Sequence, residues 1–158
     1  VMEAALRTAY FVLNGKNLKK VDFEDLRGLN GVKEAEVKID GKKIRVAIAH
    51  GLSNVEYVLN KVREAKKNNL EIPYHFIEVM ACAGGCVGGG GQPYGVTDEL
   101  RKKRAGGLYQ DDRDCSVRFS HENPYIKKLY AEYLGKPLGE KSEHLLHTHY
   151  KARPVYVK

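Results

Sequence analysis

Long hydrophobic runs are missing from this sequence of 158 residues. No stretch approaches the roughly 18 to 20 continuous apolar residues of a membrane-spanning helix, so we expect no membrane association. A signal peptide is also missing. Hydrophobic residues make up 42% and charged residues 30% of the chain, which is typical of a globular protein and not of a disordered or fibrous one.

Cysteine is scarce. The three cysteines, Cys82, Cys86 and Cys115, cannot complete a disulfide framework, and their spacing does not resemble one. Free thiols are typical of a reducing compartment. We therefore expect a cytoplasmic protein.

Acidic residues are too few to balance the basic ones, and the formal net charge is +7. Basic proteins often bind nucleic acid, and a nucleic-acid-binding module stays open as an alternative that salt-sensitive binding would reveal. However, only Arg101-Lys-Lys-Arg104 forms a tight basic cluster, and no nucleic-acid motif accompanies it. We interpret the lysines as a solvated surface and expect no nucleic-acid partner.

The chain opens inside a helical pattern without a capping residue. Apolar residues recur at helical spacing from Met2 to Leu13, yet no Ser, Thr, Asp or Asn precedes them. Asn14-Gly15 predicts the end of this helix. We expect the natural sequence to continue upstream of Val1.

A hairpin and a crossover follow. Apolar residues alternate over 35–39 and 44–48, and Asp40-Gly41 predicts the turn between these strands. Ser53 and Glu56 resemble a capping box at the start of a helix. Phe76–Met80 then predicts a short buried strand that is parallel to the strand before the helix.

Beyond Pro93 the pattern is helical. Helix starts are predicted at Thr97 or Asp98, at Asn123-Pro124 and at Ser142. The fold class is therefore α/β: a small mixed sheet with a βαβ crossover unit in residues 1–95, and a helical tail, residues 96–158, that wraps this lobe.

Two cysteines lie in a glycine-rich loop directly after the last predicted strand. Six of the eight residues from 84 to 91 are glycine, beside Cys82 and Cys86. Glycine removes side-chain bulk, so a glycine run beside thiols indicates a large sulfur-bound ligand, such as an iron–sulfur cluster. The carboxyl end of a parallel strand is also where open α/β sheets place their ligands.

Other kinds of site fit these residues less well. The spacing Cys-x₃-Cys differs from the Cys-x₂-Cys of common zinc sites. A phosphate-binding loop requires Gly-Lys-Ser/Thr, whereas Gly91 precedes Gln-Pro. The histidines at 144, 147 and 149 lack a carboxylate or cysteine at ligand spacing, and we interpret them as surface residues.

The segment from Glu78 to Pro93 has the pattern Glu-x-Met-x-Cys-x-x-x-Cys-x-x-Gly-Gly-Gly-Gln-Pro. It resembles a cluster-binding signature of the iron-only hydrogenases. The opening Val1-Met-Glu-Ala-Ala-Leu-Arg-Thr-Ala resembles a helix of the same catalytic domain. Arg118-Phe-Ser-His-Glu-Asn-Pro124 and Leu-Leu-His-Thr148 resemble the small-subunit region, here fused to the large one.

The resemblance implies specific roles for three residues. Cys82 would be a terminal ligand of a [4Fe–4S] cubane. Cys86 would bind the cubane and bridge it to the two-iron subcluster of the H-cluster, the site where protons and electrons combine. Met80 would pack beside the cluster. Ala83 departs from the proline that is common at its position, which changes loop stiffness but not ligation.

The resemblance also implies what lies outside this chain. The other two cubane ligands and a proton-relaying thiol belong to signatures that these residues do not contain, and Cys115 matches no ligand position. We therefore expect the isolated chain to be inactive and to lack the cluster, with the upstream remainder of the hydrogenase polypeptide as its partner. Ferredoxin or NAD(P)-linked electron-transfer subunits are further candidate partners. An iron–sulfur electron-transfer, assembly or sensor protein without hydrogen chemistry is the alternative.

Overall fold

The computed structural model describes residues 1–39 and 41–152. The chain divides into two compact units, Val1–Arg118 and Phe119–Lys158. Each unit is described by itself below. No helix among the described residues is long and apolar enough to cross a membrane.

The first unit is built on the predicted hairpin. Strands β1 (Val32–Ile39) and β2 (Lys42–His50) pair antiparallel, with Val32 opposite Ala49 and Ile39 opposite Lys42. Gly41 has a φ of 73°, which a residue with a side chain rarely adopts. The other predicted turn residue, Asp40, lies outside the described residues.

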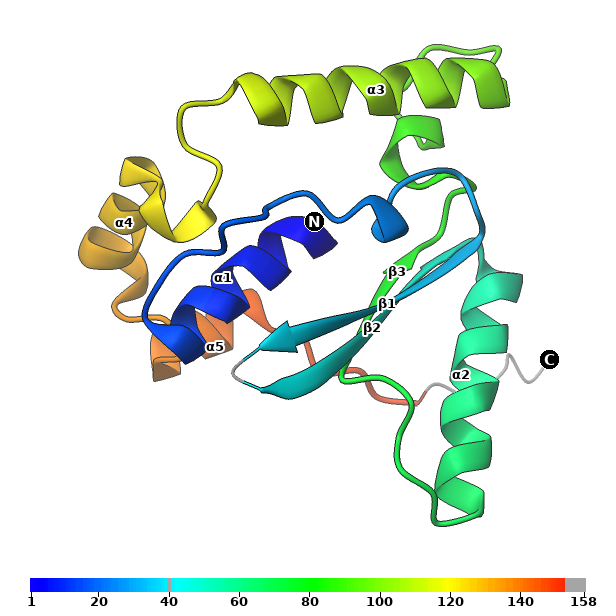
Figure 1. The fold of residues 1–158 in the computed structure, drawn as a ribbon, viewed down its shortest axis with the longest axis horizontal. Helices are drawn as coiled ribbons and strands as arrows, with labels where there is room; N and C mark the ends of the chain where they lie inside the picture. The colour runs from blue at the N-terminus through cyan, green and yellow to red at the C-terminus, as the bar shows by residue number, and fades with distance from the viewer. Residues whose placement is uncertain (40, 153–158) are drawn as a thin grey trace, which may run out of the picture. The chain divides into compact units, whose positions relative to one another are not determined.

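The predicted crossover is confirmed. Helix α2 (Leu52–Lys67) connects β2 to β3 (Phe76–Met80), and β3 pairs parallel to β2. The resulting mixed sheet has the strand order β1-β2-β3 (Figure 1). Two predicted details of this crossover, the burial of β3 and the capping box of α2, are wrong.

Strand β3 is not buried. Phe76 is 48% and Val79 51% exposed, because β3 is an edge strand of this sheet. A short, mostly apolar segment such as Phe76–Met80 does not distinguish a central strand from an edge strand, since both accept β-branched and aromatic side chains.

The predicted capping box is also absent. Helix α2 already begins at Leu52, and its N-cap is Gly51, which makes no side-chain cap hydrogen bond. Ser53 therefore lies inside the first turn. Gly51 has a φ of 78°, so the chain turns sharply between β2 and α2 at a residue that tolerates this conformation.

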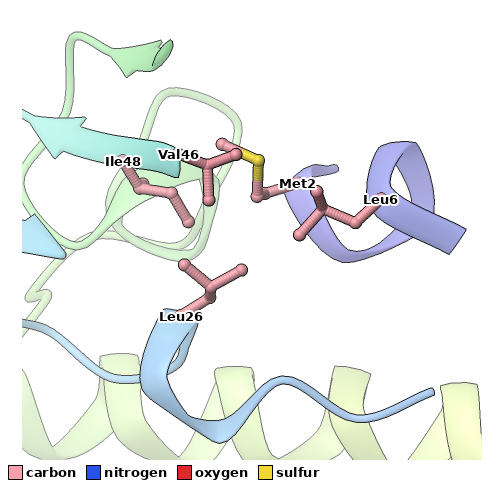
Figure 2. Close-up of a cluster of buried hydrophobic side chains, with 5 residues drawn as sticks. All are labelled: Met2, Leu6, Leu26, Val46 and Ile48. Carbon is pink, nitrogen blue, oxygen red and sulfur yellow. The ribbon is translucent and has the colours of Figure 1, made fainter. Parts of the chain in front are cut away.

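Both faces of the sheet bury side chains of β2. Helix α1 (Met2–Asn14) and the 3₁₀ turn Glu24–Leu26 cover one face, where a buried cluster forms (Figure 2): Met2, Leu6, Leu26, Val46 and Ile48. Val58 of α2 packs on Ala47 and Ala49 on the other face. β2 is thus the central strand. As predicted, α1 ends at Gly15, whose N–H donates to the Phe11 carbonyl at 2.8 Å.

Helix α3 (Asp98–Asp114) completes the first unit. Thr97, one of the two predicted caps, is the N-cap, and its Oγ1 accepts a hydrogen bond from Leu100 N–H at 3.2 Å. The helix continues to Asp114. The boundary that we placed between residues 95 and 96 stays a prediction.

The second unit is helical. It contains α4 (Pro124–Leu129), a π-helical turn (Tyr130–Leu134) and α5 (Glu140–Leu146). Asn123 caps α4 as predicted, because its Oδ1 accepts from Tyr125 N–H at 2.9 Å. Ser142, in contrast, does not open α5. It is the third residue of the helix, and its hydroxyl accepts from Gly139 N–H at 3.1 Å.

Candidate metal centre

The two thiols of the glycine-rich loop follow the parallel strand pair. Strand β3 ends at Met80, whose carbonyl accepts from Gly51 N–H at 2.8 Å. The chain then passes Cys82 and enters a 3₁₀ turn, Gly85–Gly88, that contains Cys86. Both thiols are exposed and free. The placement at the carboxyl edge of the sheet is as predicted, while the 3₁₀ turn was not anticipated.

Two backbone hydrogen bonds fix the thiol loop, one between the two cysteines and one directly after Cys86. Gly85 N–H donates to the Cys82 carbonyl at 3.0 Å, and Gly89 N–H donates to the Cys86 carbonyl at 3.1 Å. Gly84 and Gly85 both have positive φ, of 76° and 80°. A residue with a Cβ would be strained at either position.

Four glycines of the loop leave room for atoms of this chain. A Cβ on Gly89 would lie 3.2 Å from Cys82 Sγ, and one on Gly85 would lie 2.8 Å from Met80 Sδ. A Cβ on Gly84 would lie 2.9 Å from Arg101 Cδ, and one on Gly88 2.6 Å from Arg101 Nε. A Cβ on Gly90 or Gly91 would meet nothing within 4 Å. Internal packing therefore accounts for much of the glycine run that the sequence analysis attributed to a large ligand.

Helix α3 supports the loop with two arginines. Arg104 Nη1 donates to the Val87 carbonyl at 3.1 Å, directly after Cys86. Figure 1 shows the 3₁₀ turn, in green, beside the first turns of α3. The lysines were interpreted as solvated surface, and Lys102 and Lys103 are exposed, whereas Arg101 and Arg104 are half-buried. The spacing of three residues between Arg101 and Arg104 was the available signal that they share a helix face.

Polar side chains occupy the same end of the sheet. Lys33 on β1 and Glu78 on β3 lie on either side of Ile48 in the strand register, and His50 follows two residues later on β2. Together with Met80 and Cys86 they line a cavity of about 400 Å³. The sequence analysis missed this polar group, because its members meet only through the strand register.

Burial and mutual charge set the electrostatics of this group. Lys33 Nζ donates to the Gly28 carbonyl at 3.0 Å, and burial lowers the pKa of Lys33 against the opposing effect of Glu78. Burial, and then the charge of Lys33, lower the pKa of His50. Glu78 Oε2 accepts from Met2 N–H at 3.0 Å. His50 Nδ1 is buried without a hydrogen-bond partner.

The other candidate metal ligands do not lie together in one site within the described residues. Among residues 1–39 and 41–152, no group of three or more His, Cys, Asp or Glu side chains could hold a metal ion. Cys115 is exposed and forms the C-cap of α3. The described part of the chain thus offers two neighbouring thiols as donors for a metal.

Comparison with known proteins identifies the family. The family described as "Iron only hydrogenase large subunit, C-terminal domain" matches residues 1–90. This chain belongs to the iron-only hydrogenase family. A second family, "Iron hydrogenase small subunit", matches residues 98–153 of the same chain. The resemblance read from the cysteine signature is confirmed.

Relatives of this iron-only hydrogenase chain match almost all of it. The NADP-reducing hydrogenase subunit HndD of Solidesulfovibrio fructosivorans is 53% identical over 97% of this chain and 25% of its own length. Iron hydrogenase 1 of Clostridium pasteurianum is 46% identical over 96% of the chain and 26% of its own. The chain thus spans about a quarter of the length of these relatives.

A solved structure and a more distant relative extend this comparison. The [FeFe]-hydrogenase HydA1 of Chlamydomonas reinhardtii superimposes with a TM-score of 0.73 at 37% identity, and the match covers 94% of this chain and 43% of that one. Cytosolic iron-sulfur assembly component 3 of Rattus norvegicus is 30% identical over 96% of this chain and 30% of its own length. The α/β fold of the hydrogenase chain is therefore confirmed.

The residues present suit part of an iron–sulfur site. Two exposed thiols lie in one glycine-rich loop, and Gly90 and Gly91 leave open space beside it. The missing Cβ of Gly89 leaves room beside Cys82 Sγ. A cubane takes four thiolates, and the chemistry of Cys82 and Cys86 fits two of these four positions.

Proposed function

We propose that this chain forms the part of an iron-only hydrogenase that supplies two thiolate ligands of the H-cluster. Cys82 serves as a terminal ligand of the [4Fe–4S] cubane, and Cys86 binds the cubane and bridges it to the two-iron subcluster. The observation that carries this proposal is the pair of exposed thiols in one hydrogen-bonded loop, at the carboxyl ends of a parallel strand pair.

Residues of this chain hold and surround that turn. The Gly85 amide fixes the backbone between the thiols, and the Gly89 amide fixes the backbone directly after Cys86. The Met80 thioether packs under Gly85 as a soft, polarizable contact. Bound there, the cluster would supply the electron chemistry that interconverts dihydrogen with two protons and two electrons. The chain contributes ligand geometry, packing and electrostatics.

The complete reaction requires further polypeptide. The remaining two cubane ligands would come from the upstream part of the hydrogenase, which is the first proposed partner. Electrons would reach the enzyme through a ferredoxin or through NAD(P)-linked electron-transfer subunits. The exposed thiols suit a reducing compartment, which supports the cytoplasm as the location.

The domain assignment belongs to the same proposal. Residues 1–95 would form the carboxyl-terminal lobe of the catalytic domain, and residues 96–158 would form the small-subunit-like tail. The two family matches, at residues 1–90 and 98–153, support a boundary between them.

Serine substitutions in the full-length protein test the ligand roles. We expect Cys86→Ser to abolish hydrogen evolution, because serine oxygen replaces a bridging thiolate poorly. Cys82→Ser should lower the iron content, and Cys115→Ser is the matched control that should retain iron and activity. Hydrogen evolution that survives Cys86→Ser would contradict the proposed bridge.

The chain purified alone provides a second test. With two of four thiolates it should lack stoichiometric iron, since a site short of ligands leaves iron open to water and loss. A stable brown protein with about four irons per chain would contradict this expectation.

The alternative is an iron–sulfur electron-transfer, assembly or sensor protein of the same superfamily. The match to the cytosolic assembly component supports this alternative. The sequence identity of that match is 30%, well below the 53% identity to the NADP-reducing hydrogenase subunit. A full-length protein that binds a cubane yet evolves no hydrogen would support this alternative.

A further inference from the structure

The basic cluster on α3 has two halves with different surroundings. Lys102 and Lys103 are exposed, whereas Arg101 and Arg104 are partly buried against the thiol loop. Arg101 fills the space that Gly84 and Gly88 leave open, and its Nε is buried without a hydrogen-bond partner. Arg104 donates to the carbonyl of Val87. The helix therefore places two guanidinium groups against the thiol loop, that of Arg101 beside Gly84 and Gly88 and that of Arg104 at the Val87 carbonyl.

The two arginines differ in their charge balance. Arg101 Nη1 forms an ion pair with Asp98 at 2.5 Å, which offsets part of its charge. Arg104 forms no ion pair with any carboxylate of the described residues, and its guanidinium donates to the neutral carbonyl of Val87. Arg104 thus brings a positive charge that no carboxylate of the described residues neutralises. Its contact, the carbonyl of Val87, belongs to the residue directly after Cys86.

A cation at this place has a defined effect on a thiolate-bound cluster. Such a cluster is anionic, and reduction adds one more negative charge. A nearby positive charge stabilises the more negative form more strongly, and it does so most where water is partly excluded. Loss of the cation should therefore disfavour reduction.

We propose that Arg104 is a positioning residue that holds the Cys86 turn and raises the reduction potential of the cubane bound there, with Arg101 as the packing support of the same turn. This inference rests on the proposed function of Cys82 and Cys86. Arg101 and Arg104 would thus act in the cofactor site, whereas Lys102 and Lys103 of the same basic segment belong to the solvated surface.

The test is a redox titration of the cubane in the full-length protein, followed by electron paramagnetic resonance. In Arg104→Gln we expect the ratio of reduced to oxidised cluster at a fixed potential to fall about three- to tenfold. Arg104→Lys keeps the charge and should restore most of the ratio. Lys102→Gln removes one charge from an exposed position of the same helix, where water screens it, and should leave the ratio unchanged.

Two results would overturn the inference. One is an unchanged ratio in Arg104→Gln with an intact cluster. The other is Arg104→Lys behaving like Arg104→Gln, because charge would then have no part in the effect. If Arg104→Gln retains no iron, then iron retained in Arg104→Lys supports the role of the charge, and iron lost from both variants contradicts it.

A measurement without the cluster separates this inference from the proposed function. Amide hydrogen exchange at Gly89, whose N–H donates to the Cys86 carbonyl, reports how firmly the turn is held. We expect faster exchange in Arg104→Gln than in wild type and Lys102→Gln, and equal exchange would contradict the positioning role. A wild-type protein without a cubane would refute the proposed function, while the exchange experiment would still decide whether Arg104 holds the turn.

Discussion

The two compact units bury their side chains very differently. In the first unit, α1, the sheet and α2 bury Met2, Val46 and Val58 at 2% exposure or less. In the second unit, Tyr125 is 80% and Leu138 82% exposed, while Leu134, Gly139 and Ser142 are the buried residues of its described part. The thiol loop belongs to the unit that has a core. A ligand turn held by a packed sheet keeps its geometry better than one on short, one-sided helices.

The first unit also buries charge. Arg7 of α1 is 3% exposed, and its guanidinium donates to both carboxylate oxygens of Asp112 on α3 at 2.8 and 3.0 Å. Arg118 also forms ion pairs with the carboxylates of Asp112 and Asp22. The hydrogen bond from Arg7, followed by that from Arg118, holds the pKa of Asp112 well below its usual range. This network fastens α1 to the end of α3, the helix whose start supports the thiol loop.

The largest effect on stability is expected for Arg7→Met. This change removes a buried guanidinium that donates to Asp112 and to the carbonyls of Val21 and Arg118, while Asp112 keeps its bond to Arg118. Losing several charged hydrogen bonds at once should cost about 3–5 kcal/mol. Urea unfolding followed by circular dichroism measures the loss. Arg63→Met, on the exposed side of α2, is the matched control and should change stability by about 0.5 kcal/mol or less. Equal losses in both variants would mean that the buried network does not stabilise the first unit.

The difference in burial predicts a smaller effect for leucine. Leu6→Ala removes a side chain that is 4% exposed, and we expect a loss of about 2–4 kcal/mol from transfer and cavity terms. Leu145→Ala on α5, where the side chain is largely exposed, should cost about 0.5 kcal/mol or less. Similar losses at both positions in urea unfolding would remove the contrast between the units.

The sequence predicted the elements better than their surroundings. The hairpin, α1 and β3 follow from strong periodicity and from glycine stop signals, which are local properties. The edge position of β3 and the burial of β2 on both faces depend on which strands are neighbours. Ala47 and Ala49 are small, so the alternation of Ile44, Val46 and Ile48 concealed the second buried face.

The same distinction holds at the candidate site. Cys82, Cys86 and Met80 are recognised because they belong to one contiguous signature. Arg104 and His50 come from a different helix and strand, and only the folded chain brings them to the loop. The glycines were correctly singled out, yet the structure gives four of them an internal packing role that composition alone does not reveal.

The polar end of the first unit makes stability depend on pH. Burial, with the charge of Lys33, lowers the pKa of His50 in the folded state below that of an unfolded histidine. The contribution of neutral His50 to the stability of the fold is therefore complete above about pH 6.5, the pKa of an unfolded histidine. This contribution is lost as the pH falls from there through the lower pKa of the folded state. Urea unfolding between pH 8 and pH 5 should show a steeper fall for wild type than for His50→Gln. We expect this effect to be smaller than those of Arg7→Met and Leu6→Ala, because the unit keeps its packing. Parallel pH profiles would show that His50 is not the group responsible.

The smallest effect on stability is expected for a change at the start of α5 in the second unit. Two serines, Ser53 and Ser142, looked like helix-capping residues in the sequence, but only Ser142 accepts a hydrogen bond from a helix-start amide, that of Gly139. Because its hydroxyl is buried and also lies 2.9 Å from the Lys136 carbonyl, Ser142→Ala should destabilise α5 by about 0.5–1 kcal/mol. Faster hydrogen exchange at the His147 amide, which donates to Glu143, would report this loss. Ser53→Ala, at an exposed position of α2, should leave exchange in α2 unchanged. Equal exchange at His147 in wild type and Ser142→Ala would show that the cap contributes nothing to a helix with so little buried surface.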